Sequence, residues 1–228
     1  MNLGAFAIAI ARHRTIALYM AIAAAALIFA IFQTDALEYL AISAVLAILF
    51  YPFVEYGLHR FLLHMPILCR TRLTASIWRR LHYDHHMNPH DLTVLLAHPA
   101  ASVPFLAFFS LLSCLAFGIA MFPAMMFWSV LAFIYYEIMH AAAHMAPRIH
   151  GRWLVRHCRS HLRHHYVDET AHFGIGSTLL DRLFPLTARS ADKIGRSPTV
   201  RTLGYDGEMA KRYPWVAAGY ASKQSRSR

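Results

Sequence analysis

Long apolar blocks alternate with polar, basic blocks along this chain. Residues 15–32 form an apolar run behind the basic residues Arg12 and Arg14, residues 33–35 are polar, and residues 36–54 are apolar again. Each run is close to the roughly 20 residues that a helix needs to cross the hydrocarbon core of a bilayer. The pattern predicts two membrane helices joined by a tight turn.

The first apolar run has a second interpretation, as a cleavable signal peptide. A basic stretch before an apolar run is common to both kinds of segment. However, the run is long for a signal peptide, no clear A-x-A cleavage motif follows it, and the second apolar run begins almost at once. We therefore interpret residues 15–32 as the first membrane helix.

A third apolar block, residues 94–139, is too long for one crossing. Its 46 residues contain Gly118 and Pro123 near the middle, where a turn can form. The segments 55–91 and 140–228 are polar and basic, so we expect them to lie outside the bilayer. The sequence thus predicts an all-α integral membrane protein with four transmembrane helices and a helical cap.

The placement of basic residues along the chain predicts how the protein is oriented in the membrane. The chain has 22 Lys and Arg against 12 Asp and Glu, yet 57% of its residues are hydrophobic and its mean hydropathy is +0.39. Nearly all basic residues lie near the N-terminus, in the segment 55–91 or after residue 147. Because basic loops stay in the cytosol, we expect both termini and the cap there. No basic stripe with interleaved aromatic residues indicates a nucleic-acid partner.

Histidine is the residue that points to chemistry. Ten of the 16 histidines fall into four clusters, and the spacing H-x-x-H-H occurs twice. Random placement at this histidine content predicts about 0.08 copies of that spacing per chain. The clusters are His59 and His64; His82, His85 and His86; His140 and His144; and His161, His164 and His165. Under the four-helix topology, all four clusters face the cytosolic cap.

Helical geometry predicts that most of these rings converge. Residues three or four apart share a helix face, which groups each triplet and the pair His140 and His144. His59 and His64 are five apart, about 140° around an ideal helix, so they converge only at a frayed or bent helix end. Neutral imidazole is a common ligand of iron, zinc and copper. Ten rings exceed the needs of one ion and suit two ions with four or five ligands each.

These clusters resemble the histidine boxes of the fatty acid hydroxylase/sterol desaturase superfamily. The matching stretches are HRFLLH (59–64), LHYDHH (81–86), HAAAH (140–144) and HLRHH (161–165), followed by FGIGSTLLDRLF (173–184). The resemblance implies an integral membrane enzyme with a cytosolic dimetal centre. It implies that the ten box histidines are ligands, that two iron ions are the cofactor, and that O2 is the co-substrate; zinc can occupy such a site in purified protein.

The resemblance also implies a reaction and partners. Enzymes of this superfamily use O2 and two electrons to hydroxylate or desaturate lipid C–H bonds. An unactivated methylene has no acidic proton for a base to remove, so a redox-active metal is required. We expect a lipid or fatty acyl substrate from the bilayer, with hydroxylation of its acyl chain as the leading interpretation. No segment resembles a fused cytochrome b5 domain, so we expect a separate electron donor such as a ferredoxin, cytochrome b5 or a reductase.

Four further residues are candidates for contacts that orient the ligands. Glu55 lies four residues before the first cluster and Glu137 three before the third, on the same helix faces as cluster members. Ligating imidazoles usually donate their second N–H to a carboxylate or a carbonyl. His157 and His172, near the last cluster, are candidates for extra ligands or for such hydrogen-bond partners.

Two alternatives stay open on sequence grounds. Sterol or carotenoid hydroxylases and desaturases have similar boxes. A non-catalytic metal- or haem-binding membrane protein, such as a transporter, is the alternative of another class. Transporters place ligands near the bilayer midplane, whereas these clusters lie at predicted helix ends or beyond them.

The domain organisation follows from the same blocks. We expect a membrane-embedded, fatty acid hydroxylase-like domain over residues 1–186. Residues 187–228 are polar and basic and end in SKQSRSR, so we expect a tail that is partly disordered.

Overall fold

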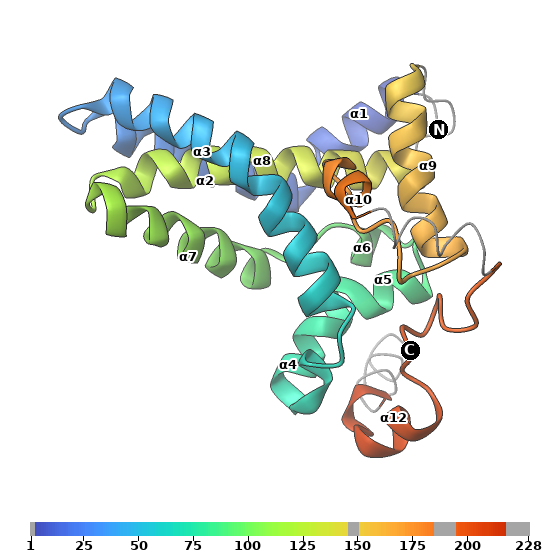
Figure 1. The fold of residues 1–228 in the computed structure, drawn as a ribbon. Helices are drawn as coiled ribbons and strands as arrows, with labels where there is room; N and C mark the ends of the chain where they lie inside the picture. Colours follow the sequence, from blue (N-terminus) through green and yellow to red (C-terminus); the bar gives the residue numbers. More distant parts are fainter. Residues whose placement is uncertain (1–2, 146–150, 185–194, 218–228) are drawn as a thin grey trace.

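The computed structural model describes residues 3–145, 151–184 and 195–217, and every regular element in these ranges is a helix (Figure 1). Four helices are long and apolar enough to cross a membrane. They are α2 (Arg14–Ile31), α3 (Ala36–Gly57), α7 (Pro99–Phe117) and α8 (Met121–Met145). The predicted all-helical fold with four candidate membrane spans is confirmed.

Helix α8 is the centre of the bundle. Helices α2, α3 and α7 each pack against it. The buried face of α2 includes Ala23, Ala26 and Ala30, small residues that let helices approach closely. Large apolar side chains such as Leu115, which is 86% exposed, cover the outside of the bundle. An apolar outer surface of this kind is suited to contact with lipid.

The turn between the third and fourth spans lies at Gly118, one of the two residues that marked it in the sequence. Gly118 has φ of +78°, a conformation that favours glycine, and its N–H donates to the carbonyl of Cys114 at the end of α7. Pro123 instead falls in the first turn of α8. Proline is tolerated there because the first N–H groups of a helix have no partner within it.

Short helices form a cap at one end of the bundle. They are η1 (Leu58–Leu63), η2 (Leu68–Arg70), α4 (Arg72–Trp78), η3 (Arg79–Tyr83), α5 (Asp84–Met87), α6 (Leu92–Leu95), α9 (Arg152–Tyr166), α10 (Leu179–Leu183) and α12 (Gly207–Arg212). In Figure 1, α9 crosses the end of the bundle beside α8, while α4 and α12 project away from it. Helix α1 (Leu3–Ala11) precedes the first span and buries Phe6 and Ile10 in the bundle core, an element that no sequence pattern predicted.

Residues 195–217 pack against the cap. Tyr205 from this segment joins the buried Trp78 of α4 in one apolar cluster. The predicted domain boundary at residue 186 stays a prediction. Residues 187–194 and 218–228 of the predicted tail lie outside the described ranges.

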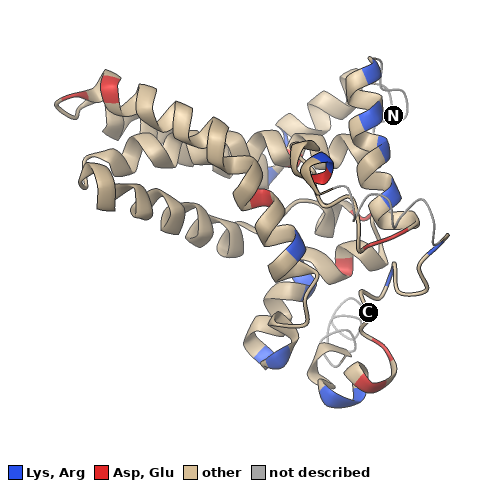
Figure 2. Ribbon diagram, in the orientation of Figure 1, with Lys and Arg blue, Asp and Glu red and all other residues tan. Residues whose placement is uncertain are grey.

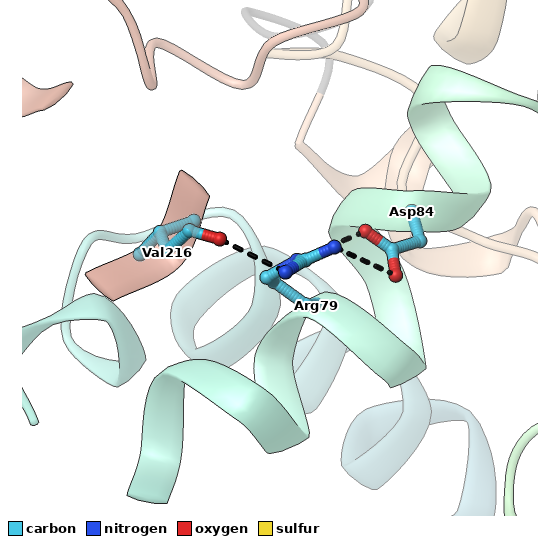
Figure 3. A network of polar contacts seen from close by, with 3 residues as sticks. All are labelled: Arg79, Asp84 and Val216. Atoms are coloured by element: carbon cyan, nitrogen blue, oxygen red, sulfur yellow. Dashed lines mark hydrogen bonds and ion pairs between the residues drawn. The ribbon is translucent and has the colours of Figure 1, made fainter. Parts of the chain in front are cut away.

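A buried ion pair ties this C-terminal segment to the second histidine cluster. The guanidinium of Arg79 donates to the Asp84 carboxylate at 3.1 Å and to the Val216 carbonyl at 2.9 Å (Figure 3). Both charged side chains are almost fully buried. A buried pair fixes its surroundings because either partner alone is left uncompensated in a medium of low dielectric constant.

Candidate metal centre

All ten histidines of the four clusters meet at the cap end of the bundle, in two groups of five. Within each group, the potential ligand atoms all lie within 4.8 Å of one another. Site one consists of His59, His64, His82, His86 and His164; site two consists of His85, His140, His144, His161 and His165. The rings therefore converge on one end of the bundle, as the helical spacing predicted.

Each H-x-x-H-H triplet contributes to both sites: one triplet gives two rings to site one and one ring to site two, and the other triplet does the reverse. The second cluster gives its outer pair, His82 and His86, to site one and gives His85 to site two. The fourth cluster gives its outer pair to site two and His164 to site one. The two triplets thus join both sites into one centre, and each remaining histidine pair completes one site. This division explains why the same spacing occurs twice in the chain.

Neighbouring rings point their Nε2 atoms at one another. In site one, Nε2 of His64 lies 2.7 Å from Nε2 of His82 and 3.0 Å from Nε2 of His164. In site two, Nε2 of His140 lies 2.8 Å from Nε2 of His85. Nitrogen ligands held about 2.0–2.1 Å from a common ion lie about 2.9–3.4 Å apart at adjacent positions. The observed separations are close to this range, so the rings are arranged as ligands around an ion would be.

A π-helical turn brings His59 and His64 together. The N–H of His64 bonds to the carbonyl of His59 at 3.2 Å, the i to i+5 bond of a π-helix, at the end of η1. A π turn is wider than an α turn, so residues five apart come to the same face. Helix η3, which carries His82, is a second π-helix. The expected bend at the H-x4-H pair therefore takes the form of a regular but wider helical turn.

Backbone carbonyls hold the outward nitrogens of three rings in site one. In each case Nδ1 donates to a carbonyl that comes from a loop, and the bonds run from His59 to Phe173 (2.5 Å), from His164 to Ala171 (2.7 Å) and from His86 to Val200 (3.1 Å). Because a carbonyl only accepts, Nδ1 carries the proton in these rings. The Nε2 lone pair is then directed to the interior, which is the tautomer that a metal needs.

The outward nitrogens of site two are held differently. Among the described residues, Nδ1 has no hydrogen-bond partner in four of its five rings, those of His85, His144, His161 and His165. The two sites are thus alike in ligand type, but in the part of the chain that the structure describes, the loop carbonyls hold outward nitrogens of site one.

Burial keeps the cap histidines neutral, which is the state that binds metal. Burial lowers the pKa of His86 to about 3. Burial, together with repulsion between neighbouring protonated rings, holds the pKa well below its usual value of 6.5 in His82, His85, His161 and His165. Protonated imidazole cannot bind a metal, so the site is prepared for binding at neutral pH.

The two predicted carboxylates bind backbone amides rather than imidazoles. Oε1 of Glu55 accepts from the N–H groups of Ile175 at 2.5 Å and Gly176 at 2.6 Å. Oε1 of Glu137 accepts from the N–H of Ala97 at 3.0 Å. Three ring N–H groups of site one go to backbone carbonyls instead. That the two carboxylates help to orient the ligands stays a prediction.

His157 and His172 lie outside both ligand groups. The Nε2–H of His157 donates to the carbonyl of Ile175. Nδ1 of His172 lies 3.1 Å from Oγ of Ser160. His172 thus belongs to the loop that follows the last histidine cluster, and His157 donates a hydrogen bond to that loop. Both contacts help to hold the loop in place.

Sequence reasoning identified residues 173–176 of this loop, residues 171–176, as part of a matching stretch but missed its contacts with the ligands. It supplies the carbonyls of Ala171 and Phe173 to His164 and His59. The available signal was the FGIG run, because two glycines in four residues indicate a close approach of backbone to other groups.

Ten imidazoles, nine of them buried and that of His64 half-buried, make up the two groups, with no carboxylate among them. Imidazole suits iron, zinc, copper and nickel, and five nitrogen donors at one site exceed the four of tetrahedral zinc. Nε2 of His86 is buried and has no hydrogen-bond partner in the described part of the chain, so its lone pair is available to an ion. The clusters can therefore hold metal, and their donor set fits two ions.

Two spaces of contrasting polarity reach site one. A cavity of about 290 Å³ between α3, η1, α4, α7 and α8 has mostly apolar walls and touches His59. A more polar pocket of about 390 Å³ is lined by His64, Arg60, Glu169 and Thr199, among others. Site one is thus the part of the centre that both an apolar molecule and small polar species can approach.

Comparison with known proteins places this centre in a family. The family model for fatty acid hydroxylase matches residues 44–185, more than half of the chain and all four histidine clusters. Fatty acid 2-hydroxylase of Mus musculus is 29% identical over 140 residues, which cover 61% of this chain and 38% of the mouse enzyme. Dihydroceramide fatty acyl 2-hydroxylase FAH2 of Arabidopsis thaliana is 31% identical over 147 residues, 60% of this chain and 56% of that enzyme.

A third sequence relative and a solved structure also match this chain. Ceramide very long chain fatty acid hydroxylase scs7 of Schizosaccharomyces pombe is 29% identical over 136 residues, and the match covers 38% of that enzyme. A solved structure of full-length scs7p, with only the hydroxylase domain visible, has a TM-score of 0.63 at 22% identity and covers 74% of this chain and 63% of that one. The chain thus spans less than two thirds of each of these relatives. The family match across all four histidine clusters, together with the shared fold, shows that this chain belongs to the fatty acid hydroxylase family.

Proposed function

We propose that this protein is a membrane-bound oxidoreductase that uses two iron ions and O2 to hydroxylate the acyl chain of a bilayer lipid. The observation that carries the proposal is the contact between His59 of site one and the apolar cavity of about 290 Å³. A hydrocarbon chain in this cavity lies against the metal-binding rings. The relatives named as fatty acid and ceramide hydroxylases support the same substrate class.

Iron bound by the two histidine groups would activate O2, the oxidant that an unactivated C–H bond requires. Hydroxylation puts one oxygen atom of O2 into the C–H bond and releases the other as water, and this requires two electrons and two protons from outside. The role of the chain is to bind the ions through ten neutral imidazoles and to fix the substrate. Zinc, which is redox-inactive, would occupy the same rings without supporting the reaction.

The cavity walls set which carbon meets site one. Phe105, Leu106 and Phe109 of α7 form one wall, and Phe133 of α8 forms part of another. These side chains offer no hydrogen bonds to an acyl chain, so position is determined by length and by packing against the walls. Apolar walls also disfavour water in the part of the cavity that would hold the acyl chain.

The cap is proposed to face the cytosol. Figure 2 shows Lys and Arg gathered on the cap helices α4, α9 and α12, while the opposite end of the bundle, near the α2–α3 turn, carries Asp35 and Glu38. Basic residues near membrane helices stay on the cytosolic side. A cytosolic cap is accessible to a separate electron donor such as a ferredoxin, cytochrome b5 or a reductase.

Mass spectrometry of total lipids tests the proposal. Cells that express the protein should accumulate acyl chains heavier by one oxygen atom. His164→Ala should abolish this product, because His164 is a member of site one. His90→Ala is the matched control, since His90 is exposed and belongs to neither ligand group.

The same experiment separates the alternatives. Loss of two hydrogens from acyl chains would indicate a desaturase, and an added oxygen on a sterol or carotenoid would indicate a different substrate class. Lipids unchanged by an iron-loaded, correctly folded protein supplied with a reductant would contradict oxygenase function.

A further inference from the structure

Two carboxylates hold four successive amides of the loop after the last histidine cluster. Asp181 accepts from the N–H groups of Phe173 at 2.9 Å and Gly174 at 3.0 Å. Glu55 accepts from the next two N–H groups, at 2.5 and 2.6 Å. Glu55 and Asp181 are 93% and 95% buried. Each carboxylate thus accepts two backbone N–H groups, so the loop is fixed from two sides.

The two glycines of the loop make this arrangement possible. A Cβ at Gly174 would lie 2.9 Å from Oδ2 of Asp181, and a Cβ at Gly176 would lie 2.6 Å from Oε2 of Glu55. Both distances are well below van der Waals contact. The carboxylates can therefore approach the backbone only because these positions have no side chain.

The fixed loop serves the rings of site one. Its carbonyls accept from Nδ1 of His164 and His59. The phenyl ring of Phe173 also packs edge-on against three rings, with centroids 5.6 Å from His59, 5.1 Å from His64 and 5.4 Å from His164. All three histidines belong to site one. Site two, whose outward nitrogens mostly lack a partner in the described ranges, receives no such support.

We propose that Glu55 and Asp181 are positioning residues that fix loop 171–176 against site one and make site one the tighter of two unequal metal sites. Hydrogen bonds from the outward nitrogen set the tautomer and direction of a ligating ring and increase its basicity. Three rings of site one have such bonds to carbonyls. The proposal rests on the proposed use of both sites for metal, but it does not depend on the substrate or the reaction.

Titration of the full-length, metal-free protein in detergent with Zn²⁺, against a competing chelator, tests the proposal without O2 or lipid. The wild-type protein should bind two ions in two steps of unequal affinity. His64→Ala, which removes a site-one ligand, should abolish the tighter step and so assign it. Repeating the titration with Co²⁺ gives an absorption spectrum that reports ligand geometry independently of affinity.

Glu55→Ala and Asp181→Ala should each weaken the tighter step by about 10–100-fold and leave the weaker step unchanged. Glu55→Gln should stay close to wild type, because an amide oxygen can accept the same two N–H groups. Glu137→Ala is the matched control: Glu137 is equally buried and also accepts a backbone amide, but it does not contact the loop. It should destabilise the protein without a selective effect on the tighter step.

Three outcomes would overturn the proposal. The first is two ions bound with equal affinity by the wild-type protein. The second is a Glu55→Ala variant, folded as judged by its helical content, with an unchanged tighter step. The third is an equal weakening of both steps in Glu55→Ala and Glu137→Ala. This would mean that the carboxylates stabilise the fold and do not act selectively on site one. Unequal zinc binding without lipid oxidation in cells would contradict the proposed function and leave this inference standing.

Discussion

The imidazoles of His86 and His165 stack with ring centroids 4.0 Å apart and an interplanar angle of 24°, although His86 belongs to site one and His165 to site two. These two rings form a wall that both sites share. The histidine rings that His59 contacts all belong to site one, and those that His140 contacts all belong to site two. His85, His161 and His164, by contrast, each contact a ring of the other site as well. Loss of a ligand should therefore have different consequences at the wall and away from it.

Removing a ligand away from the wall should release one ion only. We expect His59→Ala and His140→Ala each to reduce bound metal from about two ions per chain to about one, because the remaining rings of the other site are untouched. His86→Ala should release one ion and weaken the second as well. Metal analysis after dialysis against a weak chelator measures all three. Complete loss of metal from both His59→Ala and His140→Ala would mean that the ten rings form one indivisible site.

The Arg79–Asp84 pair should contribute strongly to the attachment of the C-terminal segment (Figure 3). Asp84→Ala removes the carboxylate to which the buried guanidinium of Arg79 donates, and we expect a loss of about 3–5 kcal/mol in the free energy of unfolding. Asp206→Ala, an exposed acidic residue on the same segment, should change it by about 0.5 kcal/mol or less. Denaturant unfolding in detergent compares the two. Equal effects would show that the pair does not hold the segment.

The sequence predicted the parts of this molecule that depend on local spacing. Four apolar spans follow from length and hydropathy, and the triplets follow from the rule that residues three and four apart share a helix face. The convergence of the H-x4-H pair was harder to predict. The angle between residues five apart in an α-helix separates His59 from His64, and only the wider π turn of η1 brings them together. A π turn has no reliable sequence signal, so spacing alone indicated only that the helix must depart from ideal geometry.

The division of ligands and the groups around them could not be predicted from spacing. Which ring of a triplet joins which site depends on how α9 crosses the bundle, a tertiary relationship. The acceptors of the ring N–H groups are carbonyls of Ala171, Phe173 and Val200, and a carbonyl is present at every residue, so the sequence gives no preference among them. Glu55 was identified from its helix face, yet it acts through a loop 120 residues away in sequence.

Filling the apolar cavity should block the reaction and leave the metal centre intact. Leu106 lines the cavity from α7, whereas Leu111 on the same helix is 52% exposed on the outer surface. We expect Leu106→Trp to abolish lipid oxidation at wild-type metal content, because the added ring volume excludes an acyl chain. Leu111→Trp should retain activity. Lipid mass spectrometry and metal analysis on the same preparations provide both readouts. Undiminished oxidation by a folded Leu106→Trp variant would place the substrate elsewhere.

The metal-free protein should be unusually sensitive to acid. Burial lowers the pKa of His86 from its ordinary 6.5 to about 3, and the pKa of five further cap histidines is also lowered: His82, His85, His161, His164 and His165. Between the folded and unfolded pKa values, the unfolded chain binds more protons than the folded chain. Stability is therefore fully present above pH 6.5 and is lost as pH falls toward the folded values.

Each such histidine should lower the free energy of unfolding by up to about 1.4 kcal/mol per pH unit below 6.5. Six histidines with pKa values lowered in the same direction should make the stability of the metal-free protein fall more steeply below pH 6.5 than a single such histidine would. Thermal unfolding in detergent between pH 7.5 and 5 measures the slope. His86→Leu should reduce the slope, and His90→Ala, at an exposed position, should not. A melting temperature independent of pH across this range would mean that the rings are solvated, which is incompatible with a buried dimetal centre.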